Sequence, residues 1–355
     1  MKCFRCQTEP CKCPDGQTVY VGDCREVLRL LPDESVNCCV TSPPYFGLRD
    51  YQVDGQIGLE TTPVEFIDKM VDVFREVRRV LTPNATLWLN LGDSYANDGK
   101  WGGQTGGKHA RALHGGATAN GRNKKYTGYK PKDLMGMPWQ VAFALRDDGW
   151  YLRCDIPWVK RAAMPDSTTD RPGRALEYFF LLAKSERYYF DMEKVRREPS
   201  GITGGACFGG PIKEEKARQK CGSALRTQQR AATKEDRDRY AATGRQMRNG
   251  DLWLESLEAP HGLVWVDDEM VGLDVNPKGY KAAHFATFPP DLIEPCILAG
   301  CPEGGVCLDP FVGSGTTLQV ARKNGCRGIG IELNPEYAKL IAKRLEQRTL
   351  FTESA

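Results

Sequence analysis

Residues 306–318 read Val306-Cys307-Leu308-Asp309-Pro310-Phe311-Val312-Gly313-Ser314-Gly315-Thr316-Thr317-Leu318. The run begins as an apolar strand, passes through a glycine-containing turn and ends where a helix begins. Gly313 and Gly315 allow the backbone to approach a ligand at the N-terminus of that helix. The turn lacks the lysine of a GxxxxGK[ST] sequence, which argues against a P-loop. The stretch therefore predicts a ligand-binding turn at one end of an α/β sheet.

A second strand follows at 328–331 and ends in Glu332. This carboxylate lies 17 residues after Gly315, close to where a nucleotide-binding α/β unit places its acceptor for ribose hydroxyls. A glycine turn alone is often only a tight structural turn, but Asp309, the glycines and Glu332 in this order form a more specific set. Asn334 then suits the N-cap of a helix that begins at Pro335.

The rest of the chain alternates helices and strands. Strands are expected at 36–40, 85–91 and 175–182, and an amphipathic helix at 64–81. This alternation indicates an α/β fold with a largely parallel sheet. The apolar stripe of the expected helix consists of Val64, Ile67, Val71, Phe74, Val77 and Leu81.

A second motif, Val40-Thr41-Ser42-Pro43-Pro44-Tyr45, follows the first of these strands. Two adjacent prolines usually mark only a turn, but the carboxyl end of a strand is where α/β proteins place their sites. The hydroxyl of Ser42 and the rigidly held carbonyl of Pro43 can both accept hydrogen bonds from one exocyclic NH2 group. Two such acceptors favour a tetrahedral nitrogen, whose lone pair can attack a methyl sulfonium. Tyr45 can stack on a base rotated out of a duplex.

Together, Ser42-Pro43-Pro44-Tyr45 and Asp309-Pro310-Phe311-x-Gly313-Ser314-Gly315-Thr316 resemble the motifs of the amino-group DNA methyltransferases that use S-adenosylmethionine (SAM). The resemblance covers residues 19–345. The Ser-Pro-Pro-Tyr motif precedes the motif that begins at Asp309, with a variable region between them, as in the family's β arrangement. The resemblance implies an α/β fold with a Rossmann-like SAM-dependent methyltransferase sheet, circularly permuted, and an inserted target-recognition region.

The resemblance also implies roles for individual residues. If the strands ending at Asp309 and Glu332 are the first two of the cofactor half, the third is the start of the chain, which brings Asp23 near the adenine of SAM. The segment 284–289 is similar to the one that covers the methionine end of SAM in this family. The catalytic residues implied are Ser42, Pro43, Pro44 and Tyr45, and the cofactor-binding residues are Asp23, Phe285, Thr287, Asp309, Phe311, Gly313, Ser314, Gly315, Thr316, Glu332 and Asn334.

Three further segments are similar to those that line the base pocket in this family. They are 90–95, 155–158 and the region 170–178, which contains Asp170-Arg171-Pro172 and Glu177-Tyr178. Here the chain departs from its relatives. Arg161 stands where proline is common, and Leu176 replaces a frequent histidine.

The net charge of +3 is unevenly distributed. Residues 98–130 contain seven lysines and arginines against one aspartate, and residues 213–248 contain eleven against five acidic residues. Charge runs are often only solvated loops, but beside these motifs they predict double-stranded DNA as the partner. We expect a DNA-clamping loop at 98–130 and target recognition in 198–280, where the candidate contacts are Tyr240, Arg245 and Trp253.

These boundaries predict four regions. Residues 1–15 are cysteine-rich, 16–197 form the catalytic half, 198–280 the target-recognition region and 281–350 the SAM-binding half. The resemblance allows for a homodimer and a cognate restriction endonuclease as partners, and for a prokaryotic or phage-encoded protein in the cytoplasm. Apolar runs are far shorter than the roughly 20 residues of a membrane span, and the start lacks the apolar region of a secretory signal.

The chain contains 14 cysteines, which we expect to be reduced thiols or metal ligands. Four of them follow the pattern Cys3-x2-Cys6-x4-Cys11-x-Cys13 in a segment with little apolar content. Four thiolates can close a tetrahedral zinc site that supplies folding energy. The alternative is a frayed tail without a metal.

The leading hypothesis is a DNA methyltransferase that acts on the N4 amine of cytosine. Adenine N6 is the nearest alternative, although the family's adenine enzymes more often carry aspartate at the position of Ser42. Methylation of cytosine C5 is disfavoured because it requires a cysteine nucleophile, usually in Pro-Cys-Gln, whereas Pro295-Cys296 precedes Ile297 in an apolar stretch. A DNA-binding protein without activity and a small-molecule methyltransferase are the alternatives from other classes.

Overall fold

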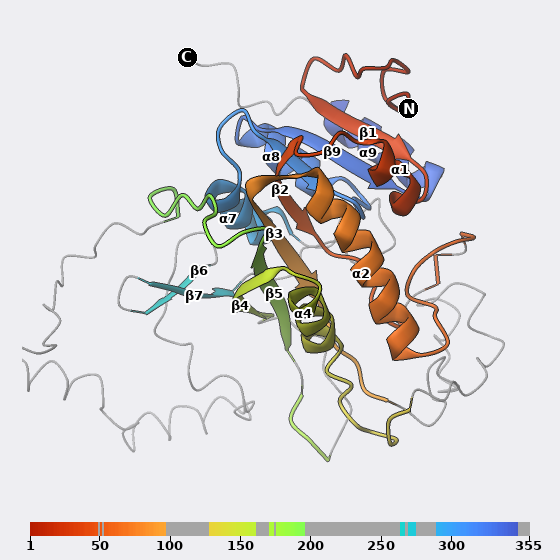
Figure 1. The fold of residues 1–355 in the computed structure, drawn as a ribbon, viewed down its shortest axis with the longest axis vertical. Coiled ribbons are helices and arrows are strands. Elements are labelled where there is room, and N and C mark those ends of the chain that lie inside the picture. The colour runs from red at the N-terminus through yellow and green to blue at the C-terminus, as the bar shows by residue number, and fades with distance from the viewer. Residues whose placement is uncertain are drawn as a thin grey trace, which may run out of the picture.

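The computed structural model describes residues 1–48, 50–51, 53–96, 128–160, 170–173, 175–195, 263–266, 269–274 and 289–346. Its centre is a nine-stranded sheet with the strand order β1-β9-β8-β2-β3-β5-β4-β7-β6 (Figure 1). The strands are β1 Gln17–Val21, β2 Val36–Thr41, β3 Leu81–Leu91, β4 Tyr151–Val159, β5 Leu176–Ala183, β6 Leu263–Val266, β7 Glu269–Asp274, β8 Val306–Asp309 and β9 Arg327–Glu332.

Helices cover both faces of the sheet (Figure 1). One hydrophobic cluster joins the strands to α1, α2 and α4. Two further clusters join the opposite face to α7, α8 and α9. The layers are therefore helix, sheet and helix, as expected for an α/β fold. The helices are α1 Cys24–Leu30, α2 Pro63–Val80, α4 Met137–Asp147, α7 Pro290–Gly300, α8 Thr316–Lys323 and α9 Pro335–Glu346.

Helix α2 shows how the local sequence sets an element. Thr62 caps its N-terminus, since its hydroxyl accepts a hydrogen bond from the Glu65 amide at 3.3 Å and the Glu65 carboxylate accepts one from the Thr62 amide. Phe74 and Val77 are fully buried, as predicted. Val64, however, is 65% exposed, so its place on the apolar stripe was wrong. The buried face turns instead through Phe66, Met70 and Val73.

The start of the chain lies beside strands from its end. Strand β1 pairs in parallel with β9, and β9 pairs in parallel with β8. Strand β8 then pairs in parallel with β2, which leads into the Ser-Pro-Pro-Tyr motif. The predicted permuted order is therefore confirmed, and the carboxyl ends of these four parallel strands meet at one edge of the sheet. Strand β5 runs antiparallel between β3 and β4.

We expect Gly300→Ala to destabilise the fold. A Cβ atom at Gly300, the last residue of α7, would lie 2.8 Å from the Thr86 hydroxyl and 3.0 Å from the Cys38 sulfur, and closer still to the Trp88 indole nitrogen. Overpacking of this kind lowers the free energy of unfolding by about 1–3 kcal/mol, which chemical denaturation measures. Leu30→Ala is the control, because Leu30 is 62% exposed on α1. Equal stabilities of the two variants would contradict this packing.

Candidate active site

A pocket opens where the carboxyl ends of β1, β2, β8 and β9 meet. Ser42 of the Ser-Pro-Pro-Tyr motif and Gly313 of the glycine turn both line this pocket, although they lie far apart in the chain. The segment after Tyr45 also contributes to the pocket lining, with Tyr51, Gln56 and Ile57. The sequence carries no motif that marks this segment. Of the predicted site residues, the pocket is lined by Asp23, Ser42, Pro44, Phe311, Gly313, Glu332 and Asn334.

Asp309 lies beneath the glycine turn and connects three elements. Its buried carboxylate accepts hydrogen bonds from the Thr41 hydroxyl at 2.6 Å, the Thr317 hydroxyl at 2.6 Å and the Phe311 amide at 3.0 Å. Burial raises the pKa of this carboxyl to about 6, against the opposing effect of these donors. Asp309 thus positions β2 against the turn between β8 and α8, while Phe311 and Gly313 line the pocket.

Ser314 and Thr316 are held from the other side of the turn by α9. The buried guanidinium of Arg344 donates to the Ser314 hydroxyl at 3.1 Å and to the Thr316 hydroxyl at 3.0 Å. It also donates to the Ser314 carbonyl. These two hydroxyls therefore fasten the turn to α9, and Gly315 between them is the N-cap of α8 with φ +83°. The sequence offered no signal for Arg344.

Glu332 and Asp23 bring two carboxylates to the ends of neighbouring strands. Val21 is paired with Glu332 in the sheet, and Asp23 follows two residues later as the N-cap of α1. Asp23 also forms an ion pair with Arg25. The Glu332 carboxylate accepts a hydrogen bond from the Asn334 amide at 2.8 Å. Burial raises the pKa of Glu332 to about 7. The pocket thus offers hydrogen-bond acceptors to hydroxyl and amine groups of a ligand.

The Ser-Pro-Pro-Tyr motif is fixed by residues of β3 and β5. Ser42 donates a hydrogen bond to Asn90 Oδ1 at 3.2 Å. The Asn90 amide nitrogen donates to the Tyr178 carbonyl at 3.2 Å, which fixes the orientation of the amide. The Ser42 oxygen also lies 3.4 Å from the Tyr45 hydroxyl. Donation of its one proton to either partner leaves oxygen lone pairs that can accept hydrogen bonds. Pro43 is buried, whereas Pro44 lines the pocket.

Tyr45 is anchored at both its ring and its hydroxyl. The hydroxyl lies 3.0 Å from Asn90 Oδ1 and 2.9 Å from Glu177 Oε2, so its one proton is shared between them. Burial, followed by the charge of Glu177, raises the pKa of Tyr45 well above its usual value. The ring lies against Gly92, where a Cβ atom would come within 2.9 Å of Tyr45 Cδ2. The phenol is thus a neutral donor in a fixed position.

Lys160 completes this network through an ion pair with Glu177. Its ammonium also lies 4.2 Å from the centre of the Trp158 ring. The sequence placed Asn90 and Glu177 in pocket segments. It did not show that their side chains meet Tyr45, because this contact depends on the antiparallel pairing of β3 with β5.

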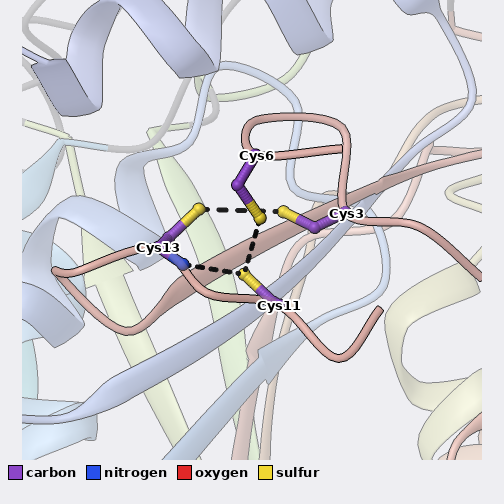
Figure 2. Close-up of side chains that lie close together, drawn as sticks. All are labelled: Cys3, Cys6, Cys11 and Cys13. Carbon is purple, nitrogen blue, oxygen red and sulfur yellow. Dashed lines mark hydrogen bonds between the residues drawn. The ribbon is translucent and has the colours of Figure 1, made fainter. Parts of the chain in front are cut away.

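Several predicted residues lie outside the described part of the chain. They are Phe285, Thr287, Tyr240, Arg245, Trp253, Arg161 and the basic stretches 98–127 and 213–248. Within the described part, no helix is long and apolar enough to cross a membrane. The four N-terminal cysteines are described, and their sulfur atoms all lie within 4.8 Å of one another (Figure 2).

Comparison with known proteins identifies the family of the chain. The DNA methylase family, which comprises N6 and N4 methyltransferases, matches residues 36–344. The type II methyltransferase M.Cfr9I of Citrobacter freundii is 41% identical over 94% of this chain and 88% of its own length. M.XycI of Xanthomonas campestris pv. cyanopsidis is 40% identical over 93% of this chain and 88% of its own length.

A solved structure supports the fold. The PvuII DNA methyltransferase, described as cytosine-N4-specific, has a TM-score of 0.56 at 18% identity and covers 94% of this chain and 88% of its own. Its likeness confirms the predicted methyltransferase fold. By sequence, fold and pocket, the chain belongs to the N6/N4 DNA methylase family and is a SAM-dependent type II DNA methyltransferase.

Proposed function

We propose that the protein methylates the exocyclic N4 amine of cytosine in double-stranded DNA. The observation that carries the proposal is the position of Ser42. Ser42 lines the same pocket as Glu332, and its hydroxyl can donate to Asn90 or Tyr45 while its oxygen still accepts. An amine acceptor and a cofactor-binding carboxylate therefore open on one cavity, as direct methyl transfer between two bound molecules requires.

The pocket residues fit SAM. Glu332 is a carboxylate at the position where α/β nucleotide sites bind ribose hydroxyls. Gly313, with φ +52°, brings the backbone to the pocket without a side chain in the way. Asp23 lies at the end of the adjacent strand, where it would accept from the adenine amine. SAM supplies an electrophilic methyl group on a sulfonium, and the residues of this chain hold the two reactants.

Ser42 and Pro43 prepare the amine for attack. The Ser42 oxygen and the Pro43 carbonyl accept the two amine hydrogens, which favours a tetrahedral nitrogen with an available lone pair. No covalent bond to the protein is needed. Tyr45 would stack on the flipped base, and its hydroxyl contacts to Asn90 and Glu177 keep the ring in place for this role.

The choice of cytosine rests on Ser42. A neutral hydroxyl suffices where the amine needs orientation more than deprotonation, and this suits cytosine. The similarly folded PvuII enzyme, described as cytosine-N4-specific, agrees with this choice. Adenine N6 is the second candidate, because both amines need the same two acceptors.

We assign DNA contact to the basic regions. The +6 charge of residues 98–130 and of residues 213–248 would neutralise phosphates, which makes binding salt-dependent. In this proposal 198–280 recognises the target, 16–197 and 281–350 form the two halves of the methyltransferase domain, and 98–130 clamps the DNA. The relatives are type II methyltransferases of bacteria, and on this basis we propose a cognate restriction endonuclease as partner and the cytoplasm as location. A homodimer is the expected assembly.

Nucleoside mass spectrometry of DNA methylated by the purified protein tests the target base. We expect N4-methylcytosine. N6-methyladenine without N4-methylcytosine would shift the assignment to adenine, and 5-methylcytosine would overturn direct amine methylation. DNA that stays unmodified, with intact SAM binding, would favour the non-catalytic alternative.

Ser42→Ala should lower kcat by roughly 100-fold, the scale of losing one positioned polar group in catalysis. SAM affinity, measured by calorimetry, should stay within about twofold, since the binding carboxylates are untouched. Ser35→Ala is the control, because Ser35 is only partly buried and its hydroxyl donates locally to the Pro32 carbonyl at 2.7 Å. A Ser42→Ala enzyme as fast as Ser35→Ala would remove Ser42 from the mechanism.

Glu332→Gln should separate stability from cofactor binding. Because burial raises the Glu332 pKa from 4.5 to about 7, the carboxyl favours the folded state most below pH 4.5, and this contribution is lost as the pH rises through about 7. At pH 8 the neutral amide should therefore raise the free energy of unfolding of the SAM-free protein by up to about 3 kcal/mol. The Tm should rise with it. SAM affinity should fall about tenfold, the loss of one charged hydrogen bond.

The matched control for this experiment is Glu303→Gln, in an exposed turn. It should change neither the Tm difference between pH 5 and pH 8 nor SAM affinity. Unchanged SAM binding by Glu332→Gln would exclude Glu332 from the cofactor site.

A further inference from the structure

We propose that Cys3, Cys6, Cys11 and Cys13 bind one zinc ion, which fixes residues 1–15 onto strand β1. Figure 2 shows the four side chains converging from two turns of the N-terminal segment. Within the described residues, this is the one group of three or more histidine, cysteine or acidic side chains close enough to share a metal ion. The site is independent of the proposed target base.

The sulfur positions match a tetrahedral site. Cys3 Sγ and Cys13 Sγ are 3.9 Å apart, and Cys6 Sγ and Cys11 Sγ are 3.7 Å apart. With zinc–sulfur bonds of about 2.3 Å, the corners of a tetrahedron lie about 3.8 Å apart. The four thiols therefore need only small shifts to enclose zinc.

Backbone amides point at two of the sulfurs. The Lys12 amide donates to Cys6 Sγ at 3.4 Å, and the Cys13 amide donates to Cys11 Sγ at 3.5 Å. Such contacts stabilise thiolates and orient metal ligands. Cys3 is buried, whereas the other three thiols are partly exposed, so that an ion can enter from solvent.

The other described cysteines have a different setting. Cys24, Cys38, Cys39, Cys296, Cys301, Cys307 and Cys326 are buried in the hydrophobic clusters between the sheet and its helices. There they act as small apolar side chains. The four N-terminal cysteines lie outside these clusters, so packing does not account for their grouping.

The zinc site would hold a segment that cannot fold on apolar contacts alone. Phe4 is its main apolar anchor, packing against the cluster of Val19 and Ile341, and the Phe4 amide donates to the Val19 carbonyl at 2.7 Å. Arg5 bonds to Asp15 at 2.7 Å, and Asp15 lies 3.7 Å from Arg322 of α8. Zinc would link the two turns that lie between these contacts, and so hold the segment against β1.

Metal analysis of the full-length protein, purified with a phosphine reductant and no added metal, tests the site. We expect about one zinc per chain in the wild type and none in Cys6→Ser/Cys11→Ser. Cys154→Ser, which removes an exposed thiol outside the cluster, should keep its zinc. Wild-type protein that takes up no zinc even after incubation with zinc chloride would overturn the proposal.

Two further measurements keep the test decisive. Cobalt in place of zinc should give the absorption bands of a tetrahedral thiolate site, which the double variant should lack. Trypsin should cut after the exposed Lys12 at least about tenfold faster once a chelator removes the metal. Protein prepared without reductant that carries no zinc and has an intact mass lower by the four hydrogens of two disulfides would replace the metal site with crosslinks. Equal cleavage with and without the chelator would show that zinc does not hold the segment.

Discussion

The buried carboxylate of Asp309 is the contact on which the site depends. It accepts hydrogen bonds from Thr41 at the end of β2 and from Thr317 in α8, and so joins the strand before the proposed catalytic motif to the turn of the proposed cofactor site. A charge in this position is unfavourable without partners, and three donors surround it. The Ser-Pro-Pro-Tyr motif begins one residue after Thr41. The distance between the two motifs is therefore set by one polar group rather than by packing alone.

The two halves of the pocket differ in how they are held. On the proposed cofactor side, burial raises the pKa values of Asp309 and Glu332. Burial therefore makes the charged form of each carboxyl less favourable than it is in water. A ligand that donates hydrogen bonds to Glu332 would relieve this cost, so in the proposed site cofactor binding would be coupled to stability. On the proposed substrate side Ser42 and Tyr45 are neutral, and the charged members of their network, Glu177 and Lys160, form an ion pair. Ser42 and Tyr45 are fixed through Asn90, which limits their reorganisation during transfer.

Much of the fold could be predicted from the sequence because its motifs mark strand ends. The strands ending at Asp309 and Glu332, and the return of the chain start beside them, were predicted correctly. The Ser42–Asn90–Tyr45–Glu177 network could not be derived, because it needs the register of β3 against β5, in which Asn90 pairs with Phe179. Arg344 was also missed, since an arginine late in an amphipathic helix is usually exposed, whereas this one is buried against the turn.

The permuted order creates a structural problem that the N-terminal segment addresses. In this arrangement the third strand of the cofactor half, β1, is also the start of the chain, and within the described sheet it pairs only with β9. A strand at the edge of a sheet exposes unpaired backbone groups. Yet β1 must stay in register, because it leads directly to Asp23 in the pocket. The contacts of Phe4 with Val19 and of Asp15 with Arg322 fasten the amino end of β1, so residues 1–15 help to hold this edge strand in register with β9.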